Sequence, residues 1–136
     1  MTARLAMMLG AIAMAIAVAL GAFGAHALKA RLSADALDVW RTGVTYHAWH
    51  ALALVAAGLL MLHMPDSAPL RFAAWLFVAG IVLFAGSLYA LALGAPGTVG
   101  AITPFGGLAF IAALIVFAIA AWRAPDLSRR PGGAHR

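Results

Sequence analysis

The chain has 136 residues, of which 65% are apolar and only 10% are charged. Ordinary soluble domains carry about 25% charged residues, and a domain of this size could not cover so much apolar surface. The composition therefore excludes a soluble monomer and a disordered chain. There are no cysteines, which excludes disulfides, thiol catalysis, thiolate zinc sites and iron–sulfur clusters.

Runs without Asp, Glu, Lys or Arg mark the membrane spans. They cover residues 5–28, 42–65 and 72–122, and are 24, 24 and 51 residues long. About 20 apolar residues cross a bilayer as a helix, so the first two runs hold one helix each and the third holds two. Turn residues at 94–100 divide the third run, and Thr103 is an expected N-cap before Pro104.

An all-α, integral membrane four-helix bundle is therefore the predicted fold, because helices satisfy their backbone groups internally in lipid. The expected helices lie at about 5–27, 46–63, 71–93 and 104–122. They form one transmembrane domain over residues 1–123, followed by a disordered basic tail at 124–136 that is rich in Pro, Gly and Arg.

The first helix has a second interpretation, as a secretory signal. Arg4, an apolar stretch and Ala25-His26-Ala27 resemble a signal with its cleavage site. The apolar stretch is longer than a signal core of about 7–15 residues, which favours retention as a span.

Small residues recur at every fourth position on two of the helices. They are Ala13, Ala17, Gly21 and Ala25 on the first helix, and Gly86, Ala90 and Gly94 on the third. Such faces allow close helix contacts in membranes, within a chain or between copies.

A short interfacial helix is expected between the first two spans. Ser33 is its predicted N-cap, and Asp35 lies in its first turn, where the helix dipole favours an anion. Leu37, Trp40 and Val44 fall on one side of it, with Trp40 at headgroup depth. This helix either ends before the second span or continues directly into it.

The distribution of Lys and Arg predicts the orientation. The side with both termini carries six of them, Arg4, Arg71, Arg123, Arg129, Arg130 and Arg136; the other side carries Lys29, Arg31 and Arg41. Both termini are therefore expected in the cytoplasm. The net charge of +5 is an anchoring signal, and no basic run interleaved with aromatics suggests a nucleic-acid partner. The expected partners are the lipid bilayer and a second copy or a larger membrane complex.

Polar side chains gather in the outer part of the predicted bundle. Polar groups in hydrocarbon are costly unless they are partnered, so these residues are expected to line one pocket near the outer surface. They are His26, Tyr46, His47, His50, Ser87, Tyr89 and Thr103.

The candidate pocket allows three interpretations. The histidines can serve a purely structural hydrogen-bonded network. His26, His47 and His50 together could bind zinc or copper, and two imidazoles on opposing helices could ligate a haem iron. A quinone or lipid could also occupy the pocket, with His26 and His50 as its contacts. The sequence does not specify a cofactor.

Enzymatic activity is not indicated. The chain has no glutamate, and Asp35, Asp38, Asp66 and Asp126 all lie outside the expected spans. Proton-coupled export commonly needs a buried carboxylate, and serine hydrolysis needs a base and a residue to orient it. No phosphate-binding loop or dinucleotide fingerprint occurs.

Four motifs, in this order, resemble the YgdD-type family of small membrane proteins (domain of unknown function 423), which includes the mitochondrial transmembrane protein 256. They are Gly21-Ala22-Phe23-Gly24-Ala25-His26, Tyr46-His47-Ala48-Trp49-His50-Ala51-Leu52-Ala53, Leu83-Phe84-Ala85-Gly86-Ser87-Leu88-Tyr89 and Ile102-Thr103-Pro104-Phe105-Gly106-Gly107. The resemblance covers residues 5–122 and implies a bacterial inner-membrane protein of four helices without an assigned activity.

The resemblance also implies which positions belong to the site. The matching residues are His26, Tyr46, His50, Gly86, Ser87, Tyr89, Thr103, Pro104, Gly106 and Gly107. His47 stands where other members carry glutamine, which disfavours a three-histidine metal site and supports a hydrogen-bonded pocket. We therefore expect a non-enzymatic structural or accessory subunit, with a ligand-binding module as the alternative.

Overall fold

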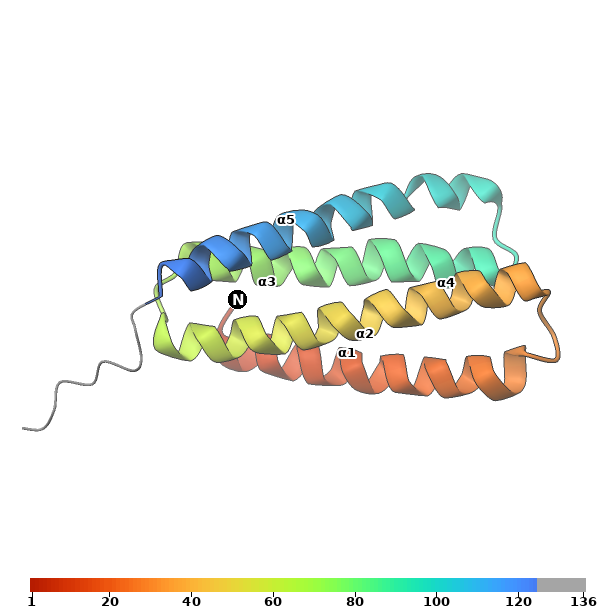
Figure 1. Ribbon diagram of the computed structural model, residues 1–136, viewed down its shortest axis with the longest axis horizontal. Coiled ribbons are helices and arrows are strands. Elements are labelled where there is room, and N and C mark those ends of the chain that lie inside the picture. Colours follow the sequence, from red (N-terminus) through yellow and green to blue (C-terminus); the bar gives the residue numbers. More distant parts are fainter. Residues whose placement is uncertain (125–136) are drawn as a thin grey trace, which may run out of the picture.

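The computed structural model describes residues 1–124, and its helices form four antiparallel spans (Figure 1). The first span is α1 (Ala3–Phe23), extended by the π-helical turn η1 (Gly24–Leu28), and the second is α2 (Ala34–His63). The third comprises α3 (Ala68–Gly80), the π-helical turn η2 (Ile81–Ala85) and α4 (Gly86–Ala92). The fourth is α5 (Thr103–Trp122), preceded by the 3-10 turn η3 (Gly97–Ala101).

The predicted fold class is confirmed, since four helices are long and apolar enough to cross a membrane. The expected tail at 124–136 lies, apart from Ala124, outside the described residues. We call the end that carries the α1–α2 and α4–α5 connections the distal end. Figure 1 shows the N-terminus and the end of α5 at the opposite end of the bundle.

The segment expected as a short interfacial helix is the first part of α2. Ser33 is the N-cap, and its Oγ accepts a hydrogen bond from the Ala36 N–H over 3.2 Å. The helix then continues without a break to His63, because no proline lies between the segment and the apolar span and the isolated Gly43 is tolerated within a helix. Of the two expected alternatives, the structure has the direct continuation, so α2 begins twelve residues before the span expected at 46–63.

The four spans are not equally embedded in the bundle. Helix α2 contacts α1 on one side and the third span on the other, and α5 packs against α3 and η2. Helix α1 packs chiefly against α2, so Figure 1 shows it at the edge of the bundle. Most of the α1 surface is consequently left exposed by the chain itself.

The core has two parts. The larger one joins α2, α3 and α5: Leu54 of α2 and Leu70 and Phe77 of α3 are fully buried, and Phe110 of α5 packs in the same cluster. The smaller one, at the distal end, contains Leu37 and Trp40. Trp40, which was expected at headgroup depth, is only 3% exposed, because its ring fills the space between α1, α2 and α4.

The small-residue face of α1 serves contact within the chain. Ala17 is 1% exposed, and a methyl group added at Gly21 would meet the Val44 side chain at 3.4 Å. The corresponding face on the third span has another role. Gly86 is exposed with open space around it, and Gly94 ends the helix with a φ of +96°, which favours glycine.

Candidate functional site

His47 and Tyr89 join α2 to α4 in the distal half of the bundle. The Nδ1 atom of His47 lies 3.2 Å from the Tyr89 hydroxyl, and the imidazole is 5% exposed. The other ring nitrogen, Nε2, is buried and has no hydrogen-bond partner within residues 1–124. A buried polar atom without a partner costs free energy, so Nε2 is an open hydrogen-bonding position.

His50 is the contact between α2 and α5. Its ring stacks on Phe110 with centroids 3.5 Å apart and an interplanar angle of 11°. Its Nδ1 lies 2.7 Å from the carbonyl oxygen of Tyr46. A carbonyl only accepts hydrogen bonds, so Nδ1 must carry the proton and Nε2 is the acceptor in the neutral ring. This histidine is held by stacking and by its own helix.

Ser87 and Thr103 join α4 to α5. Their hydroxyl oxygens lie 2.7 Å apart, and the Ser87 hydroxyl donates to the carbonyl of Phe84 over 2.9 Å. Because Ser87 has a single hydroxyl hydrogen, Thr103 is the donor between the two side chains. The prediction that Thr103 caps its helix is wrong, since Ile102 occupies the N-cap position and the threonine hydroxyl is committed to Ser87.

His26 does not join these contacts in the part of the chain that the structure describes. It lies on η1 and is exposed. Among residues 1–124, no three His, Asp or Glu side chains form a group that could hold a metal ion. Tyr46 is partly exposed and stacks with His50 at a centroid distance of 6.0 Å. Two pairs of the predicted polar residues therefore join different helices, whereas Tyr46 and His50 meet within α2 and His26 stands apart. The pairs between helices are His47 with Tyr89 and Ser87 with Thr103.

Two aromatic residues of the site were not among the positions expected from the sequence. Phe110 stacks on His50 and Phe84 packs on Tyr46, and neither ring carries a polar signal within an apolar span. Gly106 was one of the expected positions, and it lets α5 approach the backbone of Phe84. Its place beside a second glycine near a helix start is the sequence signal for this close approach.

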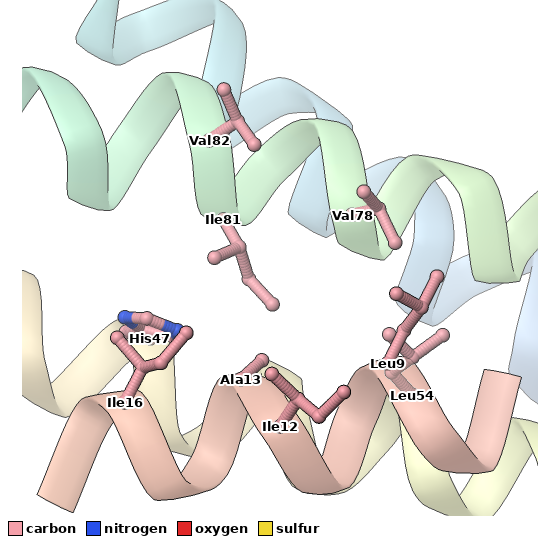
Figure 2. Close-up of a pocket in the computed structure, with 9 residues that line it drawn as sticks. All are labelled: Leu9, Ile12, Ala13, Ile16, His47, Leu54, Val78, Ile81 and Val82. Atoms are coloured by element: carbon pink, nitrogen blue, oxygen red, sulfur yellow. The ribbon is translucent and has the colours of Figure 1, made fainter.

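A membrane-facing pocket lies between α1, α2 and the third span. It has a volume of about 240 Å³, and Figure 2 shows its lining residues. In Figure 2 the labelled side chains of His47 and Ile16 both lie toward one end of the pocket. All other lining side chains are apolar: Leu9, Ile12, Ala13, Ile16, Leu54, Val78, Ile81 and Val82. This pocket was not predicted, because its lining carries no polar pattern.

These features define a four-helix integral membrane protein in which two pairs of polar side chains join neighbouring helices. The chain belongs to the family described as "Protein of unknown function (DUF423)", whose model matches residues 20–107. The family resemblance inferred from the four motifs is thereby confirmed.

Curated relatives agree with this assignment. The UPF0382 membrane protein YwdK of Bacillus subtilis is 48% identical over 113 residues, covering 83% of this chain and 92% of the relative. A UPF0382 membrane protein of Staphylococcus saprophyticus is 43% identical, with 85% of this chain and 94% of the relative covered. One from Staphylococcus haemolyticus is 40% identical, with coverages of 88% and 97%. No solved structure matches this chain.

Proposed function

We propose that the protein is a non-enzymatic structural or accessory component of the bacterial inner membrane that associates with a second copy of itself through α1. The observation that carries the proposal is the position of α1, which packs chiefly on α2 and turns its opposite face away from the chain. Membrane helices associate through close packing, so a peripheral helix with small exposed residues is suited to contact a neighbour.

The exposed face of α1 is rich in alanine. Ala11, Ala15, Ala19 and Ala22 are exposed, and at 100° per residue they lie on one side of the helix. Ala6, Gly10 and Ala17 are buried and lie on the opposite side, against α2. Large apolar residues such as Met8 and Val18 flank the alanines. This face therefore combines small residues with neighbours that can surround a second helix.

The non-enzymatic part of the proposal is supported by how the polar side chains are used. His50, Ser87, Tyr89 and Thr103 all make hydrogen bonds that join helices or cap backbone carbonyls. Asp35, Asp38 and Asp66 are exposed and lie outside the apolar runs. Asp126 falls outside the described residues. The single outer pocket expected around all seven polar residues stays a prediction.

Native mass spectrometry with cross-linking tests the association. The purified full chain is expected to contain dimers, which Ala15→Leu should convert to monomers by blocking close approach. Ala118→Leu is the matched control, since Ala118 is an exposed alanine on α5. A wild-type chain that is strictly monomeric and free of partners would overturn the proposal, as would equal dimer fractions in the wild type and Ala15→Leu.

We also propose that both termini lie in the cytoplasm. Lys and Arg are enriched on the side of the termini in the whole sequence, with six against three. Reporter fusions at the C-terminus should be active when the reporter works in the cytoplasm and inactive when it requires export. The reverse pattern would show the opposite orientation.

The alternative function is a module that binds haem, copper, quinone or lipid through His26 and His50. For a quinone, the pocket between α1 and the third span offers His47 as the contact in place of His26 and His50. The unpartnered nitrogen belongs to His47, which lines the pocket between α1 and the third span.

A further inference from the structure

The pocket beneath α1 combines an apolar lining with one unused hydrogen-bonding atom. His47 is 95% buried, lines the pocket, and holds Nε2 without a partner within residues 1–124. Its Nδ1 is engaged by the Tyr89 hydroxyl, which fixes the ring (distance 3.2 Å). The protein thus maintains an oriented imidazole at the end of an otherwise apolar space, and this arrangement suits a ligand with a single polar group.

The His47–Tyr89 pair can present either hydrogen-bonding character at Nε2. If the Tyr89 hydroxyl donates to Nδ1, Nε2 carries the proton and donates; if Nδ1 donates to the hydroxyl, Nε2 accepts. The pocket can therefore hold a carbonyl oxygen or a hydroxyl group at the same place. A head group whose oxygen can be either a carbonyl or a hydroxyl therefore suits the His47–Tyr89 pair better than a head group that offers only one of the two.

The position of the pocket excludes charged head groups. His47 lies six residues along α2 from Arg41, which is about 9 Å at the helical rise, and Arg41 is the last charged residue before the apolar run. No charged side chain lines the pocket. A phosphate or carboxylate there would lack a counter-charge, and burying it in hydrocarbon is costly. The ligand must be neutral and soluble in lipid.

The size and openness of the pocket suit one ring. An apolar cavity of about 150 Å³ holds a benzene molecule, and this one measures about 240 Å³. Ile12 and Val82 line it and are also half or more exposed toward the membrane. A substituted ring can therefore lie inside while an apolar tail continues into the bilayer.

We infer that this pocket binds the head group of an isoprenoid quinone or quinol, with one ring oxygen hydrogen-bonded to Nε2 of His47. Ile16 lines the same pocket and is 47% exposed, so its side chain can turn toward the lipid to admit the ring (Figure 2). The inference uses the face of α1 next to the third span, not the alanine face proposed for association, and it does not depend on dimer formation.

The test measures quinone binding to the full chain in nanodiscs of neutral phospholipid. The probe is a ubiquinone with two isoprene units, titrated while thermal unfolding and extracted quinone are followed. Wild-type protein should be stabilised in proportion to the quinone retained. His47→Phe should weaken binding about threefold to tenfold, as expected for one lost hydrogen bond, and His47→Gln should restore it because an amide both donates and accepts.

A second variant keeps the imidazole intact. Val82→Trp fills the mouth from an exposed position and should abolish binding without changing the fold. His63→Phe, a substitution of an exposed histidine on the same helix, is the control that should bind as the wild type does. Equal retention by the wild type, His47→Phe and Val82→Trp would overturn the inference, as would a pocket that holds only phospholipid acyl chains. Dimers that persist in Val82→Trp would show that the two proposals are separable.

Discussion

The indole Nε1–H of Trp40 donates a hydrogen bond to the main-chain carbonyl of Leu20 over 3.0 Å. This bond ties the distal ends of α1 and α2 together, and the same indole lies where a methyl group added at Gly24 would collide with it at 2.7 Å. Tyr89 of α4 also packs against the ring of Trp40, with centroids 4.7 Å apart. Trp40 therefore fixes the distal end of the peripheral helix α1 against α2, through one hydrogen bond and through the packing of its ring.

The first prediction separates the hydrogen bond from the packing of Trp40. Trp40→Phe should lower the free energy of unfolding by about 1 kcal/mol, and Trp40→Ala by about 3–5 kcal/mol, because the second also leaves a cavity. Thermal and denaturant unfolding in detergent measure both. Trp122, which is 92% exposed, provides the control, and Trp122→Phe should have no effect. Equal stability of the Trp40 and Trp122 variants would show that the hydrogen bond and the packing of Trp40 do not stabilise the fold.

Two glycines of the family motifs should respond in opposite directions to alanine. A methyl group at Gly106 would collide with the backbone of Phe84, whereas nothing lies within 4 Å of the corresponding position at Gly86. Gly106→Ala should therefore destabilise by about 1–3 kcal/mol through overpacking. Gly86→Ala should be neutral or stabilise by up to about 1 kcal/mol, because alanine is the better helix former.

Unfolding of the two glycine variants in the same detergent measures this difference. Gly107→Ala serves as a further control, since its nearest neighbour would lie at 3.7 Å, an ordinary contact distance. If Gly106→Ala and Gly86→Ala have the same stability, the close approach of α5 to η2 does not exist in solution.

The hydroxyl pair of Ser87 and Thr103 should behave as one unit. Ser87→Ala removes the acceptor for Thr103, and Thr103→Val removes the donor for Ser87, so each should cost about 1–3 kcal/mol. The double variant should lose less free energy of unfolding than the sum of the two single losses, because the second change no longer leaves a buried partner unpaired. A double-mutant cycle checks this, and strict additivity would contradict the direct hydrogen bond.

The four spans could be predicted from the sequence, since absence of charge marks apolar stretches long enough to cross a membrane. The runs at 5–28, 42–65 and 72–122 correspond to four helices in the structure. The cap at Ser33 was also correct, because a hydroxyl before a helix has a local physical role that tertiary contacts do not need to supply.

The direction in which each side chain points could not be predicted. In a span that is apolar on every face, hydrophobic periodicity does not distinguish the protein side from the lipid side. For Trp40 the sequence indicated a depth but no direction, and its ring is buried between helices. Thr103 was expected as a cap, but its hydroxyl bonds to Ser87 of α4 instead. The π-helical turn at Ile81–Ala85 also changes which faces of α3 and α4 align. No pattern of residues in the sequence predicts this turn.

The last prediction distinguishes two histidines that the sequence treated alike. His50 is 6% exposed, stacks on Phe110 and bonds to the carbonyl of Tyr46, whereas His26 is exposed on η1. His50→Leu should lower the free energy of unfolding by about 1–3 kcal/mol through loss of the stack and of the hydrogen bond. His26→Leu should leave it unchanged. Melting in detergent compares the two, and His50→Gln separates stacking from polarity, since it keeps a donor and loses the ring. If His26→Leu destabilises as much as His50→Leu, then His26 has a buried partner after all and the outer pocket must include it.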